Sequence, residues 1–264
     1  MGQGIKRIRL HLVQFPSVLG SPLATLERLQ KRLQNFRPRP GDWVLFPEMW
    51  PSGFSLENKE RLRRENSLCR AWLRAFARRY RCYLSGSMLE MKNKRAFNTA
   101  YVFGPEGKRL ASYQKIHLFE YGGEHRYFSA GTRPTVFSTP WGKIGLAICY
   151  DLRFPELFRI LSRRGARLML VPSAWPQERI DHFLSLLKAR AIENLCFVAG
   201  INKVGPGLHQ SAVTYGGHSA VFGPWGEKFG ELGKRNGLLS VTLDLSEVER
   251  VRSRYPFLRS RVLS

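Results

Sequence analysis

Short apolar segments alternate with amphipathic ones along almost the whole chain, and this alternation limits the fold more than any other feature. Strand-like runs are expected at residues 5–14, 43–46, 82–88, 96–103, 143–149, 168–171, 196–202, 219–222 and 237–244. Helical spacing of apolar residues predicts helices over residues 24–36, 59–80, 154–164 and 179–193. Strands mixed with helices throughout predict an α/β fold. Hairpin-like turns join several neighbouring strands, so we expect sheets that are not purely parallel.

Two of the predicted helices carry an apolar stripe that is expected to pack against other elements. In residues 24–36 the stripe contains Leu26, Leu29 and Leu33. In residues 59–80 the apolar side is expected to contain Leu68, Trp72, Leu73, Phe76 and Ala77.

The chain is long enough to bury a sizeable core. It has 264 residues, of which 43% are hydrophobic and 12% aromatic, and this composition excludes a disordered chain. We find no linker rich in Ser or Pro and no repeat of fixed period, so we expect a single domain over residues 1–264. No segment approaches the roughly 18 consecutive apolar residues of a membrane span, and residues 1–12 lack the pattern of a signal peptide. We therefore expect neither a membrane segment nor export.

The charge of the chain is strongly positive. Lys and Arg number 43 against 20 Asp and Glu, which gives a formal net charge of +23. A charge of this size is typical of nucleic-acid-binding proteins. The basic residues are scattered, however, and none lies in a recognisable nucleic-acid-binding motif, so nucleic acid is an unfavoured partner.

Cysteine spacing argues against a disulfide or metal framework. Cys69, Cys82, Cys149 and Cys196 are far apart and form no Cys-x-x-Cys pair, so neither a disulfide scaffold nor a zinc site is predicted. The histidines show no ligand spacing either. We expect no metal and no cofactor.

Two segments place a charged side chain beside apolar residues of strand character. Glu48 follows the run 43–46 and Pro47, and Lys115 lies in an apolar and aromatic neighbourhood within residues 113–118. Taken alone, Glu48 is more simply explained as a surface residue at a strand end. Lys115 is more simply explained as an exposed residue of an edge strand, because a buried lysine is costly unless it is paired.

A third segment leads from a buried strand into a cysteine. Residues 144–156 run from apolar positions to Cys149, then through a sharp turn into a helix. A thiol at such a turn lies near backbone N–H groups that hold a developing oxyanion. The alternative is a core cysteine, which Cys69, Cys82 and Cys196 fit better than Cys149 does. Together, a thiol, an amine and a carboxylate can form an acyl-transfer site, because the ammonium favours the thiolate and the carboxylate moves the proton.

These residues resemble those of the nitrilase superfamily, the carbon–nitrogen hydrolases with a Glu-Lys-Cys triad. In this resemblance Glu48 matches the proton-transfer glutamate, Lys115 the lysine and Cys149 the nucleophile. Further blocks that resemble the family are residues 12–14, 97–100, 171–176, 189–194, 217–219 and 223–226. The resemblance covers nearly the whole chain and implies an α/β fold of four layers, an α-β-β-α sandwich.

Within the superfamily, residues 115–119, 121–127 and 149–155 look most like the ω-amidase branch. Glu124 falls where the family places a second glutamate that positions the lysine. The resemblance implies that Cys149 attacks an amide carbonyl, that Lys115 and the backbone N–H of Tyr150 hold the oxyanion, and that Glu48 transfers protons. The implied substrate is a dicarboxylic monoamide such as 2-oxoglutaramate or 2-oxosuccinamate. Candidates to bind its far carboxylate are Arg153, Tyr121, His125 and Trp175, with a structural ion pair as the alternative for Arg153.

Several alternatives remain at this point. The same triad serves nitrilases, carbamoyl-amine hydrolases, other small-amide amidases and acyltransferases, and a basic nucleic-acid-binding protein on the same scaffold is a different class of function. The resemblance also implies a homodimer, for which the predicted helices 154–164 and 179–193 are interface candidates. A catalytic thiol and the lack of an export signal indicate the cytoplasm.

Overall fold

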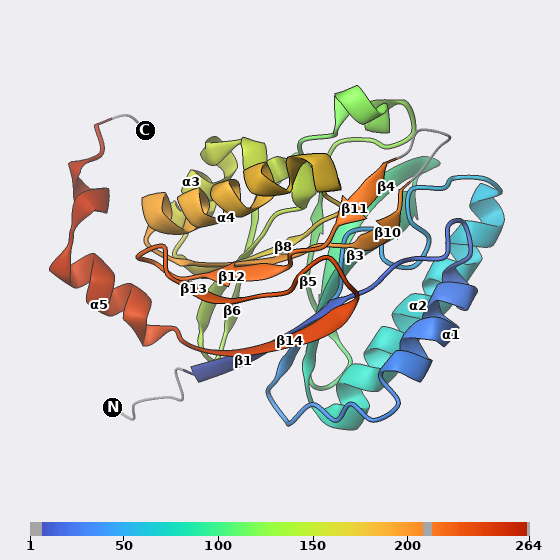
Figure 1. Cartoon of the computed structure of the whole chain (residues 1–264), viewed down its shortest axis with the longest axis horizontal. Coiled ribbons are helices and arrows are strands. Elements are labelled where there is room, and N and C mark those ends of the chain that lie inside the picture. The colour runs from blue at the N-terminus through green and yellow to red at the C-terminus, as the bar shows by residue number, and fades with distance from the viewer. Residues whose placement is uncertain (1–6, 208–212, 263–264) are drawn as a thin grey trace.

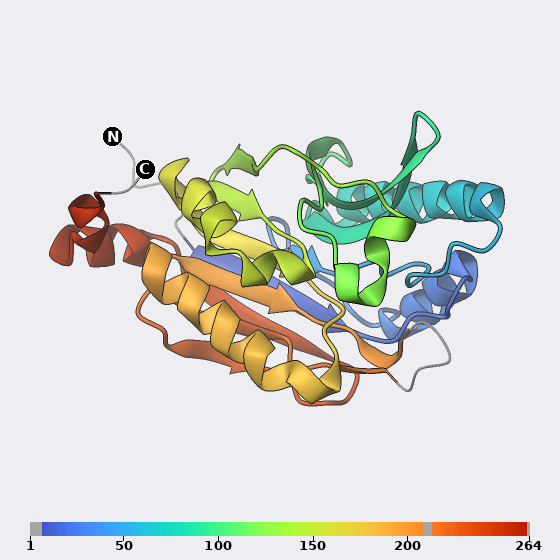
Figure 2. The same cartoon turned by 90° about the horizontal axis from the view of Figure 1, so that it is seen from above.

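The structure is a computed structural model that describes residues 7–207 and 213–262. Two six-stranded sheets pack face to face, and helices cover the outer face of each sheet (Figures 1 and 2). The predicted four-layer α-β-β-α sandwich is confirmed. Among the described residues, no helix is both long and apolar enough to cross a membrane.

The first sheet, called sheet A, has the strand order β14-β1-β2-β3-β4-β5. Strands β1, β2 and β3 run parallel, whereas β14, β4 and β5 join antiparallel at the two sides. The strands span β1 (Arg7–Gln14), β2 (Trp43–Leu45), β3 (Tyr83–Lys92), β4 (Arg95–Phe103), β5 (Arg109–Gln114) and β14 (Gly237–Asp244).

The second sheet, called sheet B, has the strand order β13-β12-β9-β8-β7-β6 and a parallel centre formed by β7, β8 and β9. Its strands span β6 (Thr135–Thr139), β7 (Gly142–Leu146), β8 (Ala166–Pro172), β9 (Phe197–Ile201), β12 (Ala220–Phe222) and β13 (Lys228–Glu231). A separate two-stranded ribbon consists of β10 (Val204–Pro206) and β11 (Thr214–Gly216). Both large sheets are mixed, as the sequence predicts.

Helices lie on both outer faces of the sandwich. α1 (Pro22–Arg32) and α2 (Lys59–Tyr80) lie together on sheet A, and α3 (Pro155–Arg163) and α4 (Ile180–Asn194) lie together on sheet B (Figure 1). α5 (Ser246–Arg254) extends away from the two sheets near the C-terminal end (Figures 1 and 2).

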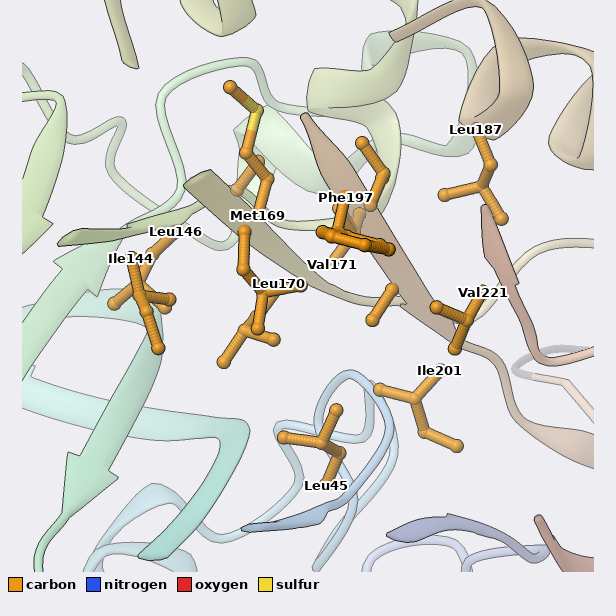
Figure 3. Close-up of a cluster of buried hydrophobic side chains, with 14 of the residues drawn as sticks. Leu45, Ile144, Leu146, Met169, Leu170, Val171, Leu187, Phe197, Ile201 and Val221 are labelled. Carbon is orange, nitrogen blue, oxygen red and sulfur yellow. The ribbon is translucent and has the colours of Figure 1, made fainter. Parts of the chain in front are cut away.

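Alternation along β2 shows why the sheets are buried on both faces. Trp43 and Leu45 point into the core between the sheets, whereas Val44 packs with α1 and α2 in a second cluster. Figure 3 shows Leu45 of sheet A facing Leu170 and Ile201 of sheet B. Because both faces of the strand are covered, all three residues of β2 are apolar.

The predicted elements differ from the observed ones where the burial of residues does not follow the local apolar pattern of the sequence. Strands β5, β6, β10, β11 and β13 and helix α5 were not predicted, because each combines exposed residues with buried or half-buried ones, which weakens the apolar pattern. The predicted strand 143–149 ends earlier, at Leu146. The predicted strand 5–14 is observed from Arg7, and its first two residues lie outside the described part of the chain. Leu68 is 51% exposed, because α2 buries the stripe Leu62, Asn66, Cys69, Leu73 and Ala77.

Candidate active site

Loops that follow strands of both sheets bring a carboxylate, an amine and a thiol to one pocket. Glu48 follows β2, Lys115 follows β5, and Cys149 begins the turn η3 (Cys149–Arg153) after β7. All three line a pocket of about 570 Å³, together with Glu124 from the turn η2 (Glu124–Arg126). The N–H of Glu48 donates to the carbonyl of Ser173 at 3.3 Å, which joins a loop of sheet A to a loop of sheet B. The structure thus places the four predicted catalytic residues together.

Lys115 is the centre of a buried charge cluster. Its Nζ donates to Glu48 Oε1 at 2.9 Å and to Glu124 Oε2 at 2.7 Å. The side chains of Lys115 and Glu48 are each 1% exposed, and that of Glu124 is 4% exposed. The alternative of an exposed lysine on an edge strand is wrong, because Lys115 lies past the end of β5, where two carboxylates offset the cost of burying its charge.

Asn98 on β4 connects the two carboxylates, and sequence reasoning gave it no role of its own. Its Nδ2 donates to Glu48 Oε1 at 2.7 Å and to Glu124 Oε1 at 3.3 Å. Ser87 Oγ on β3 donates to Asn98 Oδ1 at 2.8 Å and accepts the N–H of Met49 at 2.8 Å. Asn98 and Ser87 are both fully buried. A polar residue inside a buried strand was the signal available in the sequence, because such groups require hydrogen-bond partners.

The protonation of this cluster follows from burial and mutual attraction. Burial raises the pKa of Glu48, although the positive charge of Lys115 opposes the rise. Burial by itself disfavours the charge on Lys115, but the negative charges of Glu124 and Glu48 raise its pKa well above the usual range. Burial, aided by the negative charge of Glu48, also raises the pKa of Cys149 well above its ordinary value. The resting cysteine is therefore a thiol beside a carboxylate of raised basicity.

Cys149 sits on a sharp turn that a buried aspartate organises. Its φ of 45° lies in the left-handed region, which is strained for a side chain larger than glycine. Asp151 Oδ2 accepts the N–H of Ile148 at 2.8 Å and the hydroxyl of Tyr113 at 2.7 Å, and its Oδ1 accepts the N–H of His117 at 3.1 Å. Tyr113 and His117 flank Lys115 in the chain. Asp151, which the sequence reasoning missed, therefore fixes the cysteine turn against the lysine segment.

The predicted substrate-binding residues lie around the same pocket. Arg153 and Trp175 both line it, and the Arg153 guanidinium lies 5.1 Å from the centre of the Trp175 ring. Arg153 Nη2 lies 3.3 Å from His182 Nδ1, and no carboxylate of the described residues pairs with this arginine. The alternative of a structural ion pair for Arg153 is therefore wrong within the described chain. Trp175 is buried and donates from Nε1 to the carbonyl of Arg179 at 2.8 Å.

Aromatic residues form one wall of the pocket. Tyr150 lines it and packs against Phe119, with ring centres 5.0 Å apart. Tyr121 also lines it but is 88% exposed, which places this residue at the mouth. His125 is exposed and does not belong to the described lining, whereas Arg179, which the sequence reasoning did not single out, does.

Comparison with known proteins identifies the family. The sequence matches the carbon-nitrogen hydrolase family over residues 9–253. The chain belongs to this family. Over 246 residues the hydrolase is 34% identical to a 2-oxoglutaramate amidase of Bacillus subtilis, a match that covers 92% of this chain and 93% of that protein. It is 32% identical to an omega-amidase of Xenopus tropicalis, with coverage of 97% and 95%.

A solved structure supports the same assignment. A carbon–nitrogen hydrolase superfamily protein from Xanthomonas campestris aligns with a TM-score of 0.88 at 31% identity, and the match covers 98% of this chain and 99% of that one. The protein is therefore a hydrolase that acts on carbon–nitrogen bonds other than peptide bonds. Within the described residues of the hydrolase, no group of three or more His, Cys, Asp or Glu side chains is arranged to hold a metal ion.

Proposed function

We propose that the protein hydrolyses small linear amides through a covalent thioester on Cys149, with Glu48 as the proton-transfer group and Lys115 as the oxyanion-stabilising cation. The observation that carries the proposal is the convergence of these three side chains, from loops of both sheets, on one pocket. Glu124 holds Lys115 from the other side and positions it.

In the first half of the reaction, a carbon–nitrogen bond is exchanged for a thioester. Glu48 accepts the proton of the Cys149 thiol as the sulfur attacks the amide carbonyl. Glu48 Oε2 has no hydrogen-bond partner among the described residues, so this oxygen is available for the proton. The Lys115 ammonium and the N–H of Tyr150 stabilise the oxyanion. Glu48 then donates its proton to the leaving nitrogen, and ammonia departs.

In the second half, water replaces the sulfur. Glu48 accepts a proton from water as the water oxygen attacks the thioester carbonyl. The tetrahedral intermediate collapses, the carbon–sulfur bond breaks, and the carboxylic acid product is released. The proton on Glu48 returns to the sulfur of Cys149. The raised pKa of Glu48 suits a group that alternates between base and acid in each half-reaction.

The substrate we infer is a short dicarboxylic monoamide such as 2-oxoglutaramate or 2-oxosuccinamate. Relatives named 2-oxoglutaramate amidase and omega-amidase support this choice. Arg153 and Arg179 also support it, because both line the pocket and guanidinium groups bind carboxylates in a bidentate manner. We infer the cytoplasm as the compartment, where a catalytic thiol stays reduced.

A panel of substrates tests the proposal. We expect the purified protein to release ammonia from 2-oxoglutaramate and succinamate faster than from glutamine, N-carbamoyl amines or simple nitriles. Activity confined to nitriles or carbamoyl amines would assign the same site to another branch of the family. Transfer to an added amine that exceeds hydrolysis would indicate an acyltransferase, and no turnover of any member would contradict the proposal.

The two pocket arginines predict a specific kinetic effect. Replacing Arg153 or Arg179 with methionine is expected to raise KM for 2-oxoglutaramate by about 10- to 100-fold, since hydrogen bonds to a charged group contribute about 1.5–3 kcal/mol. The kcat is expected to change little, because the far carboxylate is bound alike in ground and transition states. The measurement is steady-state ammonia release. Propionamide, which lacks that carboxylate, should show an almost unchanged KM, and Arg133→Met, an exposed arginine outside the pocket lining, is the matched control. Equal loss on both substrates would contradict the assignment.

We also propose that two copies associate through α3 and α4. Ile160 on α3 and Ile192 on α4 are apolar residues that remain 38% and 43% exposed in the single chain, so a charge at these positions would oppose a contact through the two helices. Glutamate at both positions is expected to halve the apparent mass in light scattering. Leu23→Glu, on α1 at a similar exposure of 41%, should leave the dimer intact. A monomeric wild-type protein would contradict this prediction.

A further inference from the structure

A second buried lysine, Lys203, lies beside the proposed catalytic residues but has no part in the reaction described above. It stands between β9 and β10 and is 1% exposed. Its Nζ donates to the carbonyl of Met49 at 3.2 Å and lies 5.7 Å from the centre of the Tyr215 ring. An ammonium group has three N–H donors, so one hydrogen bond among the described residues is little support for a buried charge.

The carbonyl that Lys203 holds belongs to the residue directly after Glu48. Met49 has a φ of 45°, a left-handed conformation that costs a residue with a side chain on the order of 1–3 kcal/mol. The Met49 N–H donates to Ser87 Oγ, and the Glu48 N–H donates to the carbonyl of Ser173. The Met49 carbonyl accepts the N–H of Gly53 at 2.8 Å, and Lys203 adds a second, charged donor to it. Lys203 thus joins a set of hydrogen bonds that holds the left-handed backbone of Met49 next to Glu48.

The charges of the site explain why a second cation belongs there. The cluster around Lys115 contains one ammonium and two carboxylates, those of Glu48 and Glu124. A net negative charge in a buried site is costly, and a thiolate at Cys149 would add to it. The ammonium of Lys203 brings the two carboxylates and the two lysines to electrical balance. The negative charge of Glu48, and that of Cys149 when its thiol ionises, favour the ammonium of Lys203, so the attraction is mutual.

We propose that Lys203 is a positioning residue of this site: its ammonium holds the Met49 carbonyl, which orients Glu48, and its charge favours ionisation of Glu48 and Cys149. The inference rests on the proposed function in taking Glu48 and Cys149 as the reacting groups. Lys115 does not replace this contribution, because its ammonium already donates to Glu48 and Glu124.

The charge on Lys203 depends on pH within the neutral range. Burial lowers the pKa of Lys203 to about 7, against the opposing attraction of Glu48 and Cys149. The groups that face it are Glu48, Cys149, the Met49 carbonyl and the Tyr215 ring. The lysine is therefore charged below that pH and neutral above it. Its favourable action on Glu48 and Cys149 is present in the acidic range and is lost as pH rises.

The test compares Lys203→Met and Lys203→Arg with the wild-type protein by the rate at which iodoacetamide alkylates Cys149, followed by peptide mass spectrometry from about pH 6 to about pH 9. At about pH 6, we expect the methionine variant to react about 10-fold more slowly than the wild type, which corresponds to a shift of about one pKa unit. Above about pH 8 the two rates should converge, because the wild-type lysine is then neutral. The arginine variant stays charged and should react faster than the wild type in this alkaline range.

A purely structural role predicts a different result. Loss of packing alone would change the alkylation rate by a factor that does not vary with pH, and such a constant ratio would overturn the proposal. Should Lys203→Met fail to fold, the comparison of wild type with Lys203→Arg above about pH 8 decides the question, and identical rates would overturn it.

The assay separates this inference from the proposed function. Alkylation needs no amide substrate, so a pH-dependent ratio would support Lys203 even if no amide were hydrolysed. Conversely, Cys149-dependent ammonia release together with a constant alkylation ratio would support the proposed function and overturn the role of Lys203. Cys196 is an internal control, because burial raises its pKa to about 12 and its alkylation should not respond to Lys203.

Discussion

Replacing Cys149 with alanine is expected to abolish ammonia release from every amide that the wild-type protein hydrolyses, with a loss of at least about 10⁴-fold in kcat. The sulfur of Cys149 is the atom that would form the thioester, and no other cysteine lines the described pocket. Glu48 and Lys115 remain in the variant, but neither supplies a nucleophile. Ammonia release under saturating substrate is the measurement.

Cys196→Ala is the matched control for the loss of a buried thiol. Cys196 is fully buried next to α4 but lies outside the described pocket lining, so its removal should leave kcat within about twofold and cost some stability. Circular dichroism should show that Cys149→Ala is folded. Wild-type turnover by a folded Cys149→Ala protein would show that hydrolysis does not pass through this sulfur.

Replacing Lys115 with methionine is expected to lower both activity and stability. Loss of one oxyanion-stabilising group typically reduces kcat by about 10²- to 10³-fold. Removing one member of a buried ion pair also lowers the free energy of unfolding by about 3–5 kcal/mol, because Glu48 and Glu124 then lie buried without their cation. Ammonia release and urea unfolding measure the two effects.

The stability loss should depend on pH with a definite sign. Burial already raises the pKa of Glu48, and Lys115 supplies the charge that opposes this rise. Without Lys115 the folded variant holds a proton on Glu48 that the unfolded chain releases, so its stability falls as pH rises above the ordinary range of a glutamate. The variant should therefore be less destabilised at about pH 5 than at about pH 7.5.

Lys31→Met provides the contrast on the surface. Lys31 pairs with Glu27 on α1, and its side chain is 74% exposed, so its removal should change the free energy of unfolding by less than about 0.5 kcal/mol at either pH. A Lys115→Met protein as stable as Lys31→Met would contradict the description of Lys115 as the centre of the charge cluster.

The local pattern of apolar and polar residues determined a large part of the architecture. The helix predicted at 59–80 and the strand predicted at 237–244 have the observed bounds. Both carry a strong periodic signal along an uninterrupted segment. The placement of Cys149 at a turn between a buried strand and a helix was also predictable, because an apolar run followed by a polar, helix-starting segment leaves few other conformations.

The burial of Lys115 was not determined in this way. Its neighbours in the chain fit an edge strand as well as a buried segment. Burial of the ammonium becomes favourable only when two carboxylates approach it, those of Glu124, 9 positions away, and of Glu48, 67 positions away. The same holds for Asn98, which reaches Glu48 across 50 positions, and for Lys203, which reaches Met49 across 154.

The sequence by itself therefore determined the fold class, the order of most strands and helices, the family, and the residues that we propose as reactive, Glu48, Lys115 and Cys149. These depend on periodicity and on short motifs, which are local properties of the chain. The tertiary structure alone brought further polar groups to these residues and their pocket, namely Asn98, Asp151, Arg179 and Lys203. Their roles depend on hydrogen bonds and charges between segments that meet only when the two sheets pack together, and no local pattern encodes such distances.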